Sequence, residues 1–345
     1  MESIKNTRSG RIGFCCKWID NPDQVNGIKP KDDCKKYNTG TTTVAWLRRQ
    51  TSPIAEQKLW DLMKQNIESI RLLVERVGTL DERLRMVRIS SDILPVYTQR
   101  DFSYFWRLPD VRAYAEKYLA QIGTMARASD VRLSFHPGQF CCIVSDNPDV
   151  VDRSLEELEY HTDMIRWMGY GRTFQDFKCN VHLSGRQGIS GFDAAWQRMS
   201  PELRNCLTLE NDEYQKPLNE LLKLKDRVAI VLDIHHHLIS DNEYISATDS
   251  RIAQVKDSWR GVRPVIHYSQ SREEYISGYS DRIPDMTTLL AHTPRGKLRS
   301  HSNFYNNTHI NAWALTHLSW ADIMAESKGK NLASLQLFDQ LNEMS

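Results

Sequence analysis

The sequence predicts an α/β protein, a closed (β/α)8 barrel of the TIM type with long loops at the carboxyl ends of the strands. Short apolar runs alternate with amphipathic segments along the chain, which favours parallel pairing of strands. Most runs are apolar throughout, as in strands that are buried on both faces. Eight such runs occur, which is the strand number of a closed barrel.

The expected elements follow one another from the first apolar run. A polar stretch at about 19–50 predicts a long loop after the first strand. A helix ended by Gly78 follows, because apolar residues recur at helical spacing at Leu59, Leu62, Met63, Ile67, Ile70 and Val74. Another helix is expected near 149–168. The strands are expected at 11–16, 84–91, 131–138, 178–185, 206–212, 228–237, 264–270 and 321–327. Without a repeat or linker, we expect one domain over 1–345.

Composition excludes several classes of protein. Lys plus Arg number 45 and Asp plus Glu 44, so a surface for nucleic acid must be local and not a property of the whole chain. The seven cysteines include no Cys-x-x-Cys pair and no signal peptide precedes them, which indicates reduced thiols in a cytoplasmic protein. No apolar run approaches the roughly 18 residues that span a bilayer. We therefore expect no membrane association.

Polar residues stand at the ends of the expected strands. In a barrel the carboxyl ends of the strands converge on one mouth, where the active sites of this fold lie. Imidazole with carboxylate is a ligand set for zinc, manganese or iron, and so many donors imply two or three ions that share carboxylates. Such clusters suit phosphodiester hydrolysis, with Glu210, Asp233 and Glu326 as the catalytic carboxylates. The candidate ligands are His136, His182, Glu210, Asp233, His236, His267 and Glu326 at strand ends, and His301 in a loop.

The stretch "LDIHHH" shows why the set matters more than any one member. A single buried histidine at a strand end is usually a structural residue that has satisfied its hydrogen bonds. Seven polar residues at successive strand ends are hard to explain in that way. Within the triplet we expect His236 to be the ligand, because alternation along an extended segment turns His235 and His237 away.

The motifs resemble those of the UV damage endonuclease family from about residue 11 to 330. They are "RIGF", "RISSDILP", "SFHPGQF", "VHLSG", "LTLENDE", "LDIHHH", "IHYS", "HSNF" and "MAESKGK", in this order. The resemblance implies a barrel enzyme, similar to endonuclease IV, that nicks duplex DNA on the 5′ side of a damaged nucleotide such as a UV photoproduct or an abasic site. It also implies two or three divalent ions (manganese first, with zinc or iron possible), a monomer, and a place in the cytoplasm on the nucleoid.

The resemblance assigns roles to individual residues. A first ion is implied at His136, His182 and Glu210. A second is implied at Glu210, Asp233, His267 and Glu326, with Glu210 as the bridge, and a third at His236 and His301. Gln139 and Phe140 match a pair that probes damaged duplex, and an aromatic plane beside a planar amide can replace lost stacking and pairing.

Four positions depart from the family pattern. Phe14, among the expected DNA-binding positions, stands where a tyrosine is usual, and Phe140 replaces the commoner tyrosine. Gln99 stands where a histidine is expected near the metals. Val265 stands where the family has a lysine that becomes carboxylated beside the metals. Either valine fills the volume while water or a neighbouring side chain takes over the lysine's contacts, or the metal centre is less negative.

Three other functions remain open from the sequence: a metal-dependent sugar isomerase, a multi-iron oxidative barrel enzyme, and a non-catalytic DNA-binding relative. The "GQF" loop argues against the isomerase, and a complete set of ligands argues against the non-catalytic relative. Damaged duplex supplied with a divalent metal separates these classes by the product that forms.

Overall fold

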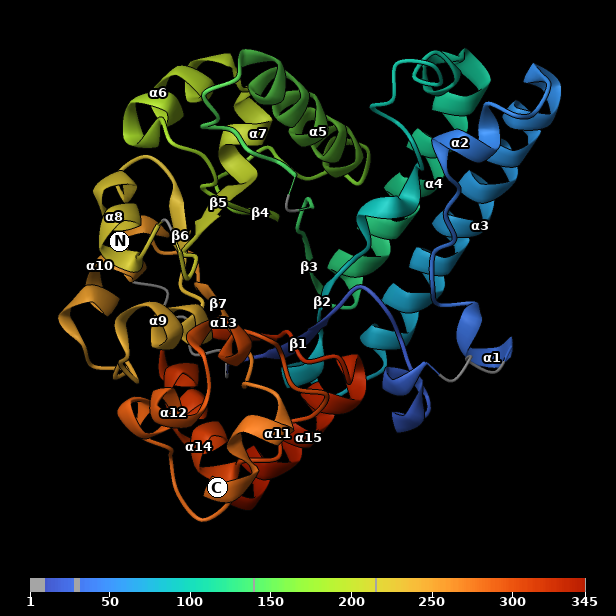
Figure 1. The fold of residues 1–345 in the computed structure, drawn as a ribbon. Coiled ribbons are helices and arrows are strands. Elements are labelled where there is room, and N and C mark those ends of the chain that lie inside the picture. Colours follow the sequence, from blue (N-terminus) through green and yellow to red (C-terminus); the bar gives the residue numbers. More distant parts are fainter. Residues whose placement is uncertain (1–9, 28–31, 139, 215, 345) are drawn as a thin grey trace, which may run out of the picture.

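Eight short parallel strands form the inner wall of the protein, in the order β6-β5-β4-β3-β2-β1-β8-β7. The computed structural model describes residues 10–27, 32–138, 140–214 and 216–344, and Figure 1 shows the helices arranged around the strands. This is the predicted TIM-barrel fold class. The strands are β1 (Ile12–Cys15), β2 (Met86–Arg88), β3 (Arg132–Phe135), β4 (Lys178–His182), β5 (Leu207–Glu210), β6 (Ala229–Val231), β7 (Val265–Tyr268) and β8 (Asp322–Ala325).

The barrel closes at the level where the candidate ligands lie. The first and last strands of the sheet, β6 and β7, meet through a parallel bridge between Asp233 and His267. The backbone N–H of His267 donates to the carbonyl of Leu232 at 3.0 Å. Closure therefore brings the residues that follow β6 next to the inner face of β7.

Helices between the strands form the outer layer (Figure 1). The predicted helix before β2 is α3, and its buried face includes Leu59, Met63, Ile67 and Val74 as the spacing indicated. The α-helices are α1 (Asp32–Lys35), α2 (Val44–Leu47), α3 (Ser52–Gly78), α4 (Pro109–Ala128), α5 (Pro148–Trp167), α6 (Gly188–Arg198), α7 (Pro201–Cys206), α8 (Leu218–Leu221), α9 (Ile234–Asp241), α10 (Ser250–Ser258), α11 (Glu273–Ile276), α12 (Met286–His292), α13 (Arg295–Leu298), α14 (Thr308–Thr316) and α15 (Lys330–Met344).

Short 3-10 helices occupy several of the connections between these elements. They are η1 (Pro22–Asn26), η2 (Glu82–Leu84), η3 (Ser91–Ile93), η4 (Phe105–Arg107), η5 (Leu222–Leu224), η6 (Ser277–Tyr279) and η7 (His317–Ser319). No helix in the described part of the chain has the length and apolar character needed to cross a bilayer.

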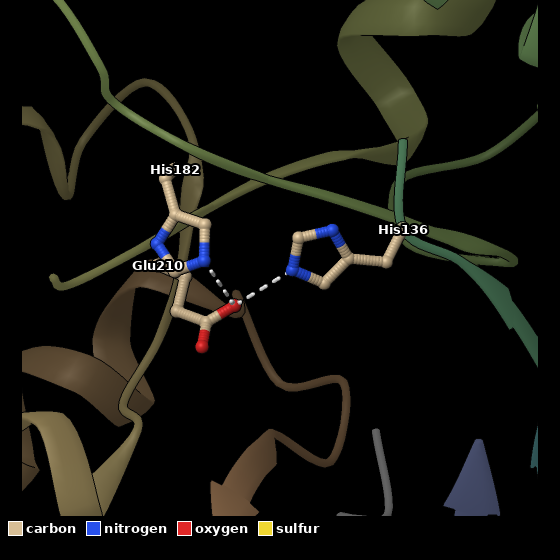
Figure 2. A group of neighbouring side chains, drawn as sticks. All are labelled: His136, His182 and Glu210. Carbon is tan, nitrogen blue, oxygen red and sulfur yellow. Dashed lines mark hydrogen bonds and ion pairs between the residues drawn. The ribbon is translucent and has the colours of Figure 1, made fainter. Parts of the chain in front are cut away.

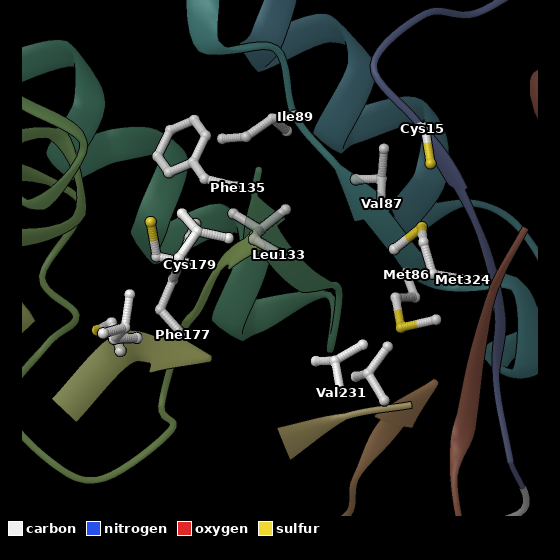
Figure 3. Packing of buried hydrophobic residues seen from close by; sticks show 14 of the residues in the cluster. Cys15, Met86, Val87, Ile89, Leu133, Phe135, Phe177, Cys179, Val231 and Met324 are labelled. Carbon is white, nitrogen blue, oxygen red and sulfur yellow. The ribbon is translucent and has the colours of Figure 1, made fainter. Parts of the chain in front are cut away.

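The core lies between the strands and the surrounding helices, and alternate side chains of each strand pack into it. Phe135 of β3 packs against Phe177, just before β4, with ring centroids 5.3 Å apart. Cys179 of β4 is fully buried near the same rings (Figure 3). Because Cys179 faces outward into this layer, its neighbours Lys178 and Asn180 face the barrel interior.

The predicted long loop after β1 contains η1, α1 and α2, and three asparagine side chains anchor it by pairing with backbone groups. Asn38 accepts from the N–H of Trp18 and donates to its carbonyl, at 2.8 and 2.9 Å. Asn331 pairs in the same way with Ile19. Asn66 of α3 pairs with Gly40. The loop is therefore attached at both of its ends, although it contains no strand among its described residues.

Candidate metal centre at the mouth of the barrel

The carboxylate of Glu210, the last residue of β5, stands between two imidazoles (Figure 2). Its Oε2 atom lies 3.2 Å from Nε2 of His136 and 3.8 Å from Nε2 of His182. His136 follows β3 directly and His182 ends β4, so three consecutive strands deliver this group. Donor atoms of the three residues lie within 4.8 Å of one another, which is close enough to hold one ion.

The second oxygen of Glu210 belongs to another group. Oε1 lies 3.0 Å from Nδ1 of His267, and that nitrogen lies 3.3 Å from Oε1 of Glu326. Donor atoms of Glu210, Asp233, His267 and Glu326 again lie within 4.8 Å of one another. Glu210 is thus common to both groups. The bridging role that the family resemblance implied for it stays a prediction.

Several buried atoms in these groups have no hydrogen-bond partner among the described residues. They include Oε1 of Glu210, Oδ2 of Asp233 and Nδ1 of His267. A buried polar atom without a partner costs about 1–3 kcal/mol. Facing carboxylate oxygens and imidazole nitrogens can recover that energy by binding a cation, so the residues present fit a divalent metal ion.

The histidine triplet lies in the first turns of a helix and not in an extended strand. β6 ends at Val231, and Asp233 is the N-cap of α9, where its Oδ1 accepts from the N–H groups of His235 and His236 at 2.7 Å each. The expected strand over 228–237 and the alternation argument were therefore wrong. An aspartate at the N-cap stabilises the first turn of a helix, which explains why the strand stops here. His236 still faces the centre.

The two flanking histidines have other partners. Nε2 of His235 lies 3.2 Å from the carbonyl of Leu298, and Nε2 of His237 lies 3.2 Å from Glu243. Nδ1 of His236 lies 3.0 Å from the carbonyl of Asn211 and 3.6 Å from Asp233, and its Nε2 lies 3.7 Å from Glu213. Of the three, only His236 is directed at the carboxylate cluster.

His301 lies beside His236, with the ring centroids 6.3 Å apart. Its Nδ1 contacts the backbone carbonyl of Glu326 at 3.0 Å, which leaves Nε2 available. Neither His236 nor His301 belongs to the two close groups of donors found in the described residues. The ligand role of this pair stays a prediction.

Burial and neighbouring charges shift the pKa values of the clustered side chains, and the direction differs from one residue to another. Burial raises the pKa of Asp233 to about 7 and lowers the pKa of His267 to about 4. Burial also acts to lower the pKa of His236, but the carboxylates of Asp233 and Glu210 outweigh it and raise that pKa to about 9. A neutral His267 keeps a lone pair for a metal, and the carboxylates around His236 favour positive charge.

Three interior residues of the centre were missed by the sequence analysis. Asn180 of β4 donates to Oε2 of Glu210 and accepts from the hydroxyl of Thr208 at 2.6 Å. Arg88 of β2 forms an ion pair with Glu326. Lys178 places its Nζ 2.7 Å from Nε2 of His267, and burial lowers its pKa to about 7. The alternation Lys178, Asn180, His182 along β4 was the signal that could have found two of them.

The positions expected to contact DNA have different surroundings. Phe140 is 84% exposed and lines a cavity of about 950 Å³ together with Gln99 and Arg153. Gln139 lies outside the described residues. The prediction that Phe14 contacts DNA was wrong, because Phe14 is 1% exposed and lies in the core. It packs edge-on against Trp18, with ring centroids 5.8 Å apart.

Strand alternation explains the place of Phe14. The neighbouring Cys15 faces inward, where its Sγ donates to the carbonyl of Ala325, so Phe14 faces the helix layer.

Fold and donor set together define a class, the β/α barrels that carry an imidazole–carboxylate metal centre at the carboxyl ends of their strands. The model of the UV-endonuclease UvdE family matches residues 24–345, and the chain belongs to this family. The resemblance seen in the motifs is thereby confirmed.

Individual relatives agree with this assignment. The UV DNA damage endonuclease of Bacillus mycoides (strain KBAB4) is 26% identical over 329 residues, which cover 90% of this chain and 91% of the relative. That of Bacillus anthracis is 24% identical over 327 residues, with 90% and 91% covered.

Solved structures show the same fold. The crystal structure of SacUVDE superposes with a TM-score of 0.71 at 20% identity and covers 97% of this chain and 99% of its own. Endonuclease IV from Thermus thermophilus superposes with a TM-score of 0.50 at 14% identity, with 80% and 94% covered.

Proposed function

We propose that this protein is a metal-dependent endonuclease of DNA repair that nicks damaged duplex DNA on the 5′ side of the lesion. The observation that carries the proposal is the position of Glu210, whose two oxygens face two separate groups of donors. A carboxylate shared in this way would hold an ion on each side. Membership of the UV-endonuclease family, and relatives named as UV DNA damage endonucleases, support DNA as the substrate.

We assign two or three divalent ions to this centre, with manganese as the first to be tested and zinc and iron as alternatives. His136 and His182 would hold one ion with Glu210, and Asp233, His267 and Glu326 the second. The pair His236 and His301 would hold a third. When bound, such ions lower the pKa of a water and neutralise the oxygen that leaves phosphorus.

The protein's own contribution to the reaction is orientation. Asn180 fixes the rotation of the Glu210 carboxylate, so that each oxygen keeps to its own group. Arg88 holds Glu326 by an ion pair and balances part of the negative charge of the three carboxylates and of the DNA phosphate. Nε of Arg88 is buried and has no hydrogen-bond partner in the described part of the chain. No side chain is needed as a covalent nucleophile, because hydrolysis uses water.

Recognition of the lesion is assigned to Phe140 and Gln139. Phe140 follows the ligand position His136 by four residues, so the loop that carries it begins at the metal centre. Its ring is mostly exposed and has no packing role, and aromatic rings stack on bases irrespective of sequence. We also propose that the protein acts as a monomer in the cytoplasm on the nucleoid.

The direct test is incision of a duplex that carries one defined lesion, either a pyrimidine dimer or an abasic site, with Mn²⁺, Zn²⁺ or Fe²⁺ supplied in turn. We expect one nick 5′ of the lesion with a 3′-hydroxyl end, and no nick in the undamaged duplex. Trapping of a protein–DNA imine with borohydride would indicate lyase chemistry and contradict the proposal. Equal cutting of both duplexes would remove the claim of lesion recognition.

A further inference from the structure

Lys178 is a buried lysine whose partner is a histidine. It opens β4 and is 2% exposed, yet no carboxylate of the described residues forms an ion pair with it. Its Nζ contacts Nε2 of His267 at 2.7 Å. Burying a lysine is costly unless its amine has a partner.

The contact joins two walls of the barrel. β4 and β7 are separated by β5 and β6 in the closed sheet, so the side chain of Lys178 extends through the interior to reach His267. Asn180 and His182, on the same face of β4, lie further toward the mouth and contact Glu210. Lys178 is therefore placed beneath the donor groups and not among them.

The same contact decides which ring nitrogen of His267 is available. With its proton on Nε2, the ring donates to the amine nitrogen of Lys178 and keeps its lone pair on Nδ1. Nδ1 faces Oε1 of Glu210 at 3.0 Å and Oε1 of Glu326 at 3.3 Å. A hydrogen bond to one nitrogen of a metal-binding histidine fixes the orientation of its ring and the nitrogen that it presents. Here the presented nitrogen is the one that has no hydrogen-bond partner among the described residues.

We propose that Lys178 is a positioning residue that holds His267 with Nδ1 directed at the ion between Glu210, Asp233 and Glu326. This inference rests on the proposed metal centre and adds a determinant of its affinity. Val265 of β7 cannot supply this contact. It lies two residues before His267 on the same face of β7, is buried, and has no polar atom to offer the ring.

The test is the retention of metal by the purified metal-loaded protein during dialysis against increasing concentrations of chelator. Lys178→Met replaces the amine by an apolar group of similar length. We expect about 10- to 100-fold less chelator to remove one ion per chain, the effect typical of lost orienting partners. Lys178→Gln keeps a shorter polar group and is expected to lie between Lys178→Met and the wild type.

Two further variants separate positioning from packing. Cys179→Ala truncates the neighbouring side chain of β4, which faces the helix layer, and should retain its metal as the wild type does. Val265→Lys in the Lys178→Met background supplies an amine from β7 beside His267 and should restore retention. The absorption bands of protein loaded with Co²⁺ give a second readout, because a displaced ligand changes them in Lys178→Met and rescue restores them.

The outcomes are distinct. Equal metal retention by Lys178→Met, Lys178→Gln and the wild type would overturn the role of Lys178 while leaving the proposed metal centre intact. Loss of metal from Cys179→Ala to the same degree, or failure of Val265→Lys to restore retention, would show that Lys178 acts through packing and would also overturn the inference. A wild-type protein that binds no divalent ion would contradict the proposed function itself.

Discussion

Substitution of Asn180 by Ala tests how the protein orients its bridging carboxylate. Asn180 lies at the bottom of the first donor group, where its amide donates to Oε2 of Glu210, the oxygen that faces His136 and His182. A hydrogen bond to a buried carboxylate contributes about 1.5–3 kcal/mol, which corresponds to roughly 10- to 150-fold in an equilibrium constant. We therefore expect Asn180→Ala to weaken the affinity for the ion at this group by roughly 10- to 150-fold.

A graded control comes from Thr208, whose hydroxyl donates to Oδ1 of Asn180 at 2.6 Å and, among the described residues, forms no hydrogen bond with the Glu210 carboxylate. Thr208→Val removes one neutral hydrogen bond of about 0.5–1.5 kcal/mol, so roughly a 2- to 12-fold loss is expected. Titration calorimetry with Mn²⁺ measures both variants. If Asn180→Ala binds Mn²⁺ as tightly as the wild type does, or no more weakly than Thr208→Val, the orienting role of Asn180 is refuted.

Three further predictions concern the shared carboxylate, the exposed aromatic ring and a buried histidine. Glu210→Gln removes the carboxylate shared by both groups, so elemental analysis should find at least two ions fewer per chain than in the wild type, and the loss of one ion or none would contradict bridging. Phe140→Ala should weaken binding to damaged duplex by about 1–3 kcal/mol without changing metal content, whereas equal affinity would exclude stacking by this ring. His317, remote from the centre, has its pKa lowered to about 4 by burial, with Nδ1 accepting from Trp320 and Nε2 facing the carbonyl of Ile245. The pKa of His317 in the folded state lies below the ordinary 6.5, so its contribution to the free energy of unfolding is complete above pH 6.5. That contribution is lost as the pH falls toward 4, and about 2 kcal/mol of it is lost at pH 5. His317→Gln should flatten the fall in urea stability between pH 7 and 5, and an unchanged slope would assign that fall to other groups.

The barrel was predictable because its signal is distributed over the whole chain. Eight apolar runs with helical segments between them specify a parallel sheet buried on both faces, and no single boundary matters to that inference. Boundaries themselves were less secure. The run at 228–237 reads as one apolar segment, yet Asp233 caps a helix with its side chain and ends the strand early.

The two candidate donor groups were predictable because most of their members stand at strand ends, where topology brings them together. Residues inside the barrel were harder to identify, since a lone Lys178 or Arg88 in a strand carries no motif, and the contact with His267 or Glu326 forms only when opposite walls meet. The prediction for Phe14 was wrong for a related reason, because alternation on β1 directs Cys15, and not Phe14, to the barrel interior. The direction of a side chain from a short strand depends on register, which the sequence alone does not specify.

The most direct measurement of the central claim is anomalous diffraction at the manganese absorption edge from crystals grown with Mn²⁺. Two peaks should flank the carboxylate of Glu210, one beside His136 and His182 and the other beside Asp233, His267 and Glu326. A single peak would contradict the bridging role of Glu210, and the absence of any peak at this carboxylate would contradict the metal centre as a whole.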